Sequence, residues 1–221
     1  YKLKLLLLML VIIKKYNIFI ISFIFLCGLL TTFAQNDTDT FRMKLALGLH
    51  NPIDDGENDG YYSKRFNFPT VDFGFQYLFS RTTGAKLDFG FNRAVSATTS
   101  SIFKLNYSRI NMQIVYDFTN FLDIFPKNLY GQVHFGPGIS FTKPLANDSD
   151  NTYTFLNILI GTEISYTITK RFALICDLSF AKSMVGKDKY SNEVDGYSFK
   201  GDLIYTTFGF TVALSGCQYC K

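Results

Sequence analysis

Two histidines are the residues of this 221-residue sequence best suited to acid–base chemistry. His50 and His134 each lie in a stretch where apolar and polar residues alternate, and we expect Asp117 and Glu163 as neighbours of His134. A histidine beside carboxylates can act as a general base, but the same residue types also form buried ion pairs. No nucleophile can be assigned to either histidine, so the sequence favours a protein that is not an enzyme.

The cysteines and the acidic loop suggest no bound metal or cofactor. Cys217 and Cys220 form one C-x-x-C, which offers two of the four ligands that structural zinc requires, and no thioredoxin-like βαβ pattern surrounds it. Asp54, Asp55, Glu57 and Asp59 cluster in residues 53–66 without the spacing of an EF-hand. We therefore expect no cofactor and a solvated acidic loop.

Nine charged residues share a different property, because each lies opposite the apolar positions of an alternating stretch. They are Arg42, Lys44, Asp72, Lys86, Asp88, Arg109, Asp117, Glu163 and Asp177. Four are basic and five are acidic, so we predict that they face a common interior and pair with one another. Glycines recur at the same inward positions, and we expect them to make room for the long Arg and Lys side chains.

Alternation with a period of two residues predicts eight strands. Their expected ranges are 41–50, 69–79, 84–95, 103–119, 129–142, 153–168, 171–183 and 202–214. Most reach the ten or so residues needed to cross a bilayer at a tilt. The long polar connections after the first, third, fifth and seventh strands should lie at one end, and the shorter ones after the second and sixth at the other.

A charged interior and an apolar exterior suit a closed barrel in lipid, where every backbone group must be paired. The sequence is 17% aromatic, with 24 Phe, 14 Tyr and no Trp, and Phe and Tyr would form the aromatic belts of a membrane barrel. The alternative is a soluble β-sandwich, which would place its apolar faces inward and its charges on the surface. The strand lengths favour an all-β, eight-stranded antiparallel transmembrane β-barrel.

The first 34 residues have the features of a secretory signal peptide. Lys14 and Lys15 precede an apolar stretch over residues 18–30, and a small residue, Ala34, precedes Gln35. A transmembrane anchor helix is the alternative, since this stretch is nearly long enough to span a membrane. Cleavage after Ala34 would leave 18 basic and 18 acidic residues, and this balance argues against a nucleic-acid partner.

These features together resemble the OmpA/OmpX-type small outer-membrane barrels. The residues TFAQ around the expected cleavage site and the Lys/Asn/Ile/Phe-rich composition resemble porin-family barrels of Bacteroidetes. The resemblance covers about residues 41–214 and is architectural, so it implies a bacterial outer-membrane location and a fold more strongly than an activity. It implies a signal peptide with an upstream extension over 1–34, a barrel domain over 35–214 and a short tail over 215–221.

Two classes of function follow for such a barrel. The first is a structural or interaction role: envelope integrity, adhesion or membership of an envelope complex. It would involve contact with outer-membrane lipid and, through residues 51–68 and 184–201, with other envelope proteins. The second is a narrow pore for small solutes, and a lipid-modifying enzyme is a weaker alternative. An eight-stranded barrel has an interior that side chains nearly fill, which favours the first class.

Overall fold

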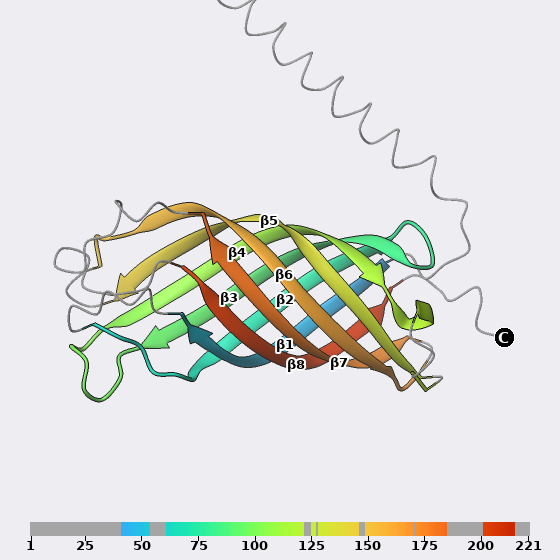
Figure 1. The fold of residues 1–221 in the computed structure, drawn as a ribbon, viewed down its shortest axis with the longest axis horizontal. Helices are drawn as coiled ribbons and strands as arrows, with labels where there is room; N and C mark the ends of the chain where they lie inside the picture. Colours follow the sequence, from blue (N-terminus) through green and yellow to red (C-terminus); the bar gives the residue numbers. More distant parts are fainter. Residues whose placement is uncertain are drawn as a thin grey trace, which may run out of the picture. The chain divides into compact units, whose positions relative to one another are not determined.

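Eight antiparallel strands close into one barrel (Figure 1). The computed structural model describes residues 41–53, 61–121, 125–126, 128–145, 149–169, 171–184 and 201–214. The strands are β1 (Phe41–Pro52), β2 (Asn67–Leu78), β3 (Thr83–Val95), β4 (Lys104–Asp117), β5 (Leu129–Leu145), β6 (Tyr153–Thr167), β7 (Phe172–Ser183) and β8 (Leu203–Ala213). Each strand pairs with the next along the chain, and β1 pairs with β8 to close the sheet. The predicted eight-stranded antiparallel barrel is confirmed, and the sandwich alternative is excluded.

The largest difference from the predicted boundaries is at the end of β5, which continues to Leu145 instead of ending at residue 142. Beyond Thr142, the last β5 residue paired with β6, β5 pairs only with β4, and Pro144 lies opposite Leu105. A proline lacks an amide hydrogen and is tolerated where one side of a strand is unpaired. The extension therefore costs β5 no ladder hydrogen bond to β6.

The connections differ in length between the two ends of the barrel. At one end, called the turn end here, Ser80 and Phe79 donate backbone hydrogen bonds to Thr83 O at 3.1 and 3.0 Å, which closes the tight β2–β3 turn. The β4–β5 connection at this end contains a 3-10 turn, η1 (Thr119–Phe121). The opposite end, called the loop end, carries the long connections. Among the described residues, no helix is long and apolar enough to span a membrane.

Some predicted segments lie outside the described residues. They are the signal segment 1–34, residues 54–60 with the acidic residues of the first loop, residues 185–200 of the loop 184–201, and the tail 215–221 with Cys217 and Cys220.

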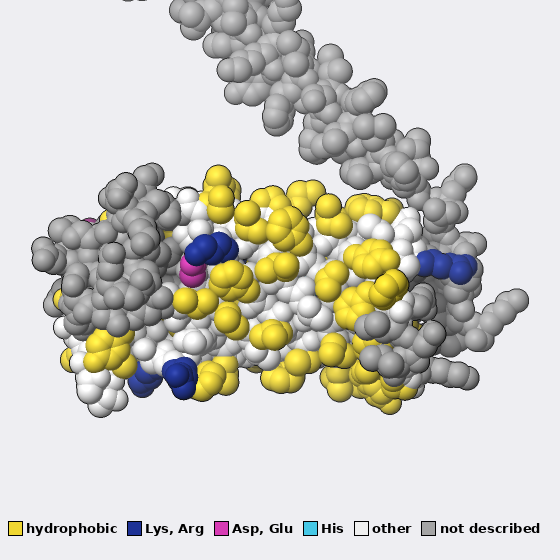
Figure 2. Space-filling view, in the orientation of Figure 1, with side chains coloured by type: hydrophobic (Ala, Val, Ile, Leu, Met, Phe, Trp, Pro, Cys, Tyr) yellow, Lys and Arg dark blue, Asp and Glu magenta, His cyan; other side chains and the backbone are white. Residues whose placement is uncertain are grey.

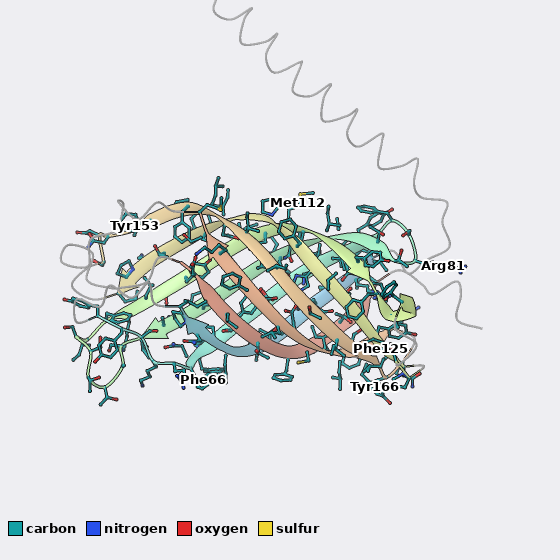
Figure 3. The ribbon with its side chains drawn as sticks, viewed as in Figure 1. Phe66, Arg81, Met112, Phe125, Tyr153 and Tyr166 are labelled. Carbon is teal, nitrogen blue, oxygen red and sulfur yellow. The ribbon has the colours of Figure 1, made fainter. Side chains whose placement is uncertain are left out.

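The outward face of the barrel is apolar along most of its length (Figure 2). Met112, Ile114 and Phe208 keep 63–67% of their surface exposed although they are hydrophobic. Figure 3 shows Met112 near the middle of the barrel, between Tyr153 at the loop end and Tyr166 at the turn end. A soluble monomer rarely exposes so extensive an apolar surface, and such a band is typical of a surface that contacts lipid.

Aromatic rings are concentrated toward the turn end of this outward face. Tyr77 packs against Phe79 with ring centroids 5.6 Å apart, and Phe172 stacks on Phe210 at 5.4 Å. Such rings are typical of the membrane–water boundary of outer-membrane barrels. In this chain without Trp, Phe and Tyr supply the rings at this end of the outward face.

Candidate functional site

Seven of the nine charged residues predicted to face inward meet in the barrel interior. They are Lys44 of β1, Asp72 of β2, Lys86 and Asp88 of β3, Arg109 of β4, Glu163 of β6 and Asp177 of β7. We call these seven residues the charge network. None is more than 4% exposed. Because successive side chains of a strand point to opposite faces, the apolar outward phase of each strand sends these residues into the interior.

Lys44 is the cation with the closest carboxylate contacts in the charge network. Its Nζ donates a hydrogen bond to Asp177 Oδ2 at 2.6 Å. The same Nζ lies 3.0 Å from Glu163 Oε2 and 3.6 Å from Asp72 Oδ2. One ammonium group thus joins carboxylates from β2, β6 and β7 across the interior.

Lys86 extends the charge network toward β3. Its Nζ lies 3.5 Å from Asp88 Oδ2, 3.6 Å from Asp177 Oδ2 and 3.9 Å from Glu163 Oε2. Asp88 also accepts a hydrogen bond from Gln113 Nε2 at 3.1 Å. Lys86 Nζ forms no hydrogen bond to the described residues at these separations, so Lys86 contributes charge compensation alone.

Arg109 forms a second centre of the network and is held on three sides. One guanidinium nitrogen lies 3.0 Å from Asp72 Oδ1, and another donates to Asn92 Oδ1 at 2.6 Å. The guanidinium carbon lies 4.1 Å from the centre of the Tyr205 ring, a cation–π contact. A Cβ atom at Gly90 would lie 2.2 Å from that carbon, so a larger residue there would displace the guanidinium group.

The other inward glycines differ in what they accommodate. A Cβ at Gly48, Gly136 or Gly209 would lie 1.8–2.1 Å from a backbone oxygen of the neighbouring strand. The prediction that inward glycines make room for Arg and Lys side chains is therefore correct at Gly90 and wrong at these three positions. There the missing side chain allows neighbouring backbones to approach closely within the curved sheet.

His134 lies beside the charge network, and its partners differ from those predicted. Its Nδ1 lies 2.5 Å from Gln113 Oε1 and its Nε2 lies 3.2 Å from Asp177 Oδ2. Asp177 also accepts a hydrogen bond from Ser179 Oγ at 2.5 Å. The prediction that Asp117 and Glu163 flank His134 is wrong, because its contacts are with Gln113 and Asp177. Three permanent cations, Lys44, Lys86 and Arg109, face four carboxylates here.

Two predicted members of the site lie elsewhere. Arg42 is half-buried near the start of β1 at the turn end, and no ion pair involves it among the residues that the structure describes. Asp117 ends β4 and accepts a hydrogen bond from the backbone N–H of Thr119 at 2.8 Å. Asp117 thus stabilises the start of η1 and is not part of the interior network. Both residues share the inward phase but lie too near the end of the barrel to reach the network.

Neutral polar groups continue the network toward both ends. Gln132 donates to Glu163 Oε1 at 2.6 Å, and Gln76 donates to Gln132 Oε1 at 3.2 Å. On the other side, Asn111 donates to Asn157 at 2.5 Å, and Asn157 donates to Ser140 Oγ at 2.7 Å. These hydrogen bonds connect inward polar side chains of different strands, although Asn111 Oδ1 has no hydrogen-bond partner among the described residues.

An apolar cluster lies inside the barrel between the charge network and the loop end. Its members are Ala94, Phe103, Leu105, Tyr107, Phe155, Leu159, Ala181, Leu203 and Tyr205. We call these residues the inner apolar cluster. Leu105, Leu159 and Leu203 are fully buried. Tyr61 and Tyr153 pack against the cluster from the loop end.

Alternation alone does not predict the inner apolar cluster, although the sequence carries a signal for it. In residues 155–160 (FLNILI) apolar residues occupy both phases of the strand. Phe155 and Leu159 of this segment are buried in the interior, whereas Leu156 and Ile160 are 63% and 53% exposed outside. A strand that loses its alternation at one end indicates apolar surroundings on both faces.

The interior contains no evident catalytic arrangement among the described residues. His50 Nδ1 lies 2.9 Å from Thr70 Oγ1, and both residues are buried. The Ser179 hydroxyl donates a hydrogen bond to the Asp177 carboxylate, and His134 contacts an amide and a carboxylate. No group of three or more His, Cys, Asp or Glu side chains in the described part of the chain is placed to hold a metal ion. The arrangement is suited to filling and bracing the barrel.

Comparison with known proteins identifies similar folds among solved structures but assigns no family. No family model matches the sequence, and no curated protein matches it. Neisserial surface protein A (NspA) superposes with a TM-score of 0.56 at 11% identity, over 79% of this chain and 97% of NspA. The outer membrane protein OprG from Pseudomonas aeruginosa gives 0.53 at 9% identity, over 80% and 96%. At such identities the likeness concerns the fold alone, and it shows that this chain has the fold of small outer-membrane β-barrels.

Proposed function

We propose that this protein is a non-enzymatic barrel of the bacterial outer membrane, with a structural or interaction role and a sealed interior. The exposed apolar band and the aromatic rings near the turn end support a location in lipid. The fold shared with NspA and OprG supports the outer membrane as the location. The proposal includes removal of residues 1–34 as an export signal, and the Lys/Asn/Ile/Phe-rich composition supports an origin in the Bacteroidetes.

The observation that carries this proposal is the double occlusion of the interior. The charge network joins strands on opposite sides of the barrel through Lys44, which contacts Asp177, Glu163 and Asp72. The inner apolar cluster adds a second layer that has little affinity for ions or water. A solute would have to break buried ion pairs and also cross an apolar layer, so the pore is the less favoured alternative.

The loop end is the surface that supports an interaction role. The β1–β2 and β3–β4 connections contact each other at this end. Ser63 forms a β-bridge with Ser96, and the Tyr62 backbone N–H donates to Ser100 Oγ at 2.9 Å. This paired edge leaves Ile102 92% exposed and Phe66 69% exposed. Exposed apolar residues on connecting segments are suited to contact with another molecule. We therefore propose the loop end, including residues 51–68 and 184–201, as the face toward other envelope proteins.

Purified protein inserted into planar bilayers should show no steady single-channel conductance. The expectation follows from the two occluding layers, and insertion is verified in the same sample by the heat-dependent shift in gel mobility of folded barrels. The alternative of a narrow pore would give reproducible conductance steps. Steps whose size changes in Gln76→Ala, which alters an inward polar side chain of β2, would establish conduction through the barrel and contradict the sealed interior.

Arginine at Ile160 should destabilise the barrel in lipid by about 2–4 kcal/mol, because an outward charge near the membrane midplane is costly. Ile160 is 53% exposed and lies within β6. Thr154→Arg is the matched control on the same strand and face, near the loop end, where the expected cost is about 0–1 kcal/mol. The free energy of unfolding by urea in lipid vesicles measures both. Equal costs at the two positions would contradict a membrane-spanning band.

A further inference from the structure

We propose that a basic patch on the outward face of the barrel binds phosphate groups of lipid headgroups in the leaflet at the loop end. The patch consists of Arg93 of β3, Lys104 and Asn106 of β4, and Lys143 of β5. We call these four residues the basic patch. The inference rests on the proposed location in a membrane and adds a lipid class and a binding site to it.

The strand register brings the basic patch together. Arg93 pairs with Asn106, and Asn106 pairs with Lys143, so the three form one row across β3, β4 and β5. Neighbouring strands lie about 4.8 Å apart, and the row therefore extends over about 10 Å. Lys104 lies two residues from Asn106 on the same face of β4, toward the loop end. Arg93, Lys104 and Lys143 are all exposed.

The positive charges of the basic patch are not neutralised by the described residues. Arg93 Nε donates to the neutral Asn106 Oδ1 at 2.9 Å, and its guanidinium carbon lies 5.8 Å from the centre of the Phe91 ring. Neither contact neutralises its charge. No described Asp or Glu forms an ion pair with Arg93, Lys104 or Lys143. Lys182, another basic residue on an outward strand face, differs because it pairs with Asp202. The patch thus concentrates three unpaired positive charges on one side of the barrel.

The rows beneath the basic patch favour a lipid as its occupant. Toward the middle of the barrel, the next outward row is Phe91, Ser108 and Phe141. The row after that is Phe89, Ile110 and Ile139, whose side chains are 38–43% exposed. The surface changes from basic to apolar within two rows, about 13 Å along a strand. An amphiphile with an anionic headgroup above acyl chains matches this order, and basic residues near a membrane surface attract anionic headgroups.

Native mass spectrometry of the detergent-solubilised full chain tests the basic patch. The probes are bisphosphorylated lipid A and the same lipid after removal of both phosphates. Arg93→Gln combined with Lys143→Gln removes two charges from the patch. The control combines Arg81→Gln with Arg171→Gln, which removes two exposed charges at the turn end. We expect the patch variant to lose roughly 25-fold in affinity for the phosphorylated lipid, about fivefold for each residue, and the control to keep the wild-type affinity.

Three outcomes would overturn this inference. Equal binding of the two lipids by the wild-type chain would exclude phosphate recognition. Equal losses in the patch variant and its control would show a general charge effect. Full displacement of the lipid by inorganic phosphate would assign the site to the free ion. The heat-dependent gel shift is measured separately in lipid vesicles: its absence would defeat the proposed membrane barrel, whereas an inserted barrel without lipid discrimination would defeat only the basic patch.

Discussion

Replacing Lys44 with methionine is expected to lower the free energy of unfolding by about 3–5 kcal/mol, the cost of breaking a buried ion pair. The ammonium group of Lys44 contacts Asp177, Glu163 and Asp72 within 3.6 Å. Methionine preserves most of the side-chain volume, so the loss is electrostatic. Two cations, Lys86 and Arg109, would then face the four carboxylates. Urea unfolding in lipid vesicles measures the change.

Two further variants separate the network from charge in general. Lys64→Met removes one exposed lysine charge that belongs neither to the charge network nor to the basic patch, and its expected change is within about 0.5 kcal/mol. Asp177→Asn in the Lys44→Met background removes one buried negative charge and should restore part of the lost stability. If Lys44→Met proved as stable as Lys64→Met, the interior charges would not brace the barrel. A further loss in the double variant would show that Asp177 is needed for its own hydrogen bonds.

The fold could be predicted because a two-residue period indicates a strand and also shows which side chains share one face of the sheet. Lys44, Lys86 and Arg109 lie in phase with glycines and amides, and the opposite phase is apolar, so the interior was identifiable from one sequence. In a closed barrel this phase also decides which residues meet water or lipid. The charges were therefore assigned to the interior without any knowledge of strand register.

Partners within the interior could not be predicted in the same way. His134 of β5 was expected to contact residues of β4 and β6, its neighbours in chain order, but it also reaches Asp177 of β7. Lys44 similarly reaches Glu163 of β6 across the barrel. Such contacts depend on the stagger of the strands and on the barrel's diameter, which alternation does not contain. Alternation correctly predicts that Arg42 faces inward. It contains no information on position along the barrel, so it does not show that Arg42 lies too near the turn end to join the network.

Arg109→Leu is the second substitution with a large expected effect, again about 3–5 kcal/mol of lost stability. Arg109 is 1% exposed and is the largest fully buried side chain. Its loss removes the 3.0 Å contact with Asp72, the 2.6 Å hydrogen bond to Asn92 and the cation–π contact with Tyr205. Asp72 would keep only Lys44, at 3.6 Å, as a positive neighbour among its described ion pairs.

Two companion variants identify which of these contacts matters. Arg109→Lys keeps the charge but cannot form the planar fork that reaches Asp72 and Asn92 together, so we expect a smaller but clear loss of stability. Asp72→Asn combined with Arg109→Leu removes both charges, and a double-mutant cycle then gives their coupling free energy. A coupling near zero would mean that Arg109 acts mainly through packing on Tyr205.

The response of conductance to Arg109→Leu distinguishes bracing from plugging. Leucine is shorter than arginine, and its introduction removes one positive charge from the network. The inner apolar cluster still closes the interior toward the loop end through Leu105, Leu159 and Leu203, which are fully buried. The variant should therefore unfold at lower urea in vesicles and still conduct no steady current in planar bilayers. Steady conductance in this variant alone would mean that Arg109 itself closes the barrel and that the apolar cluster is no seal.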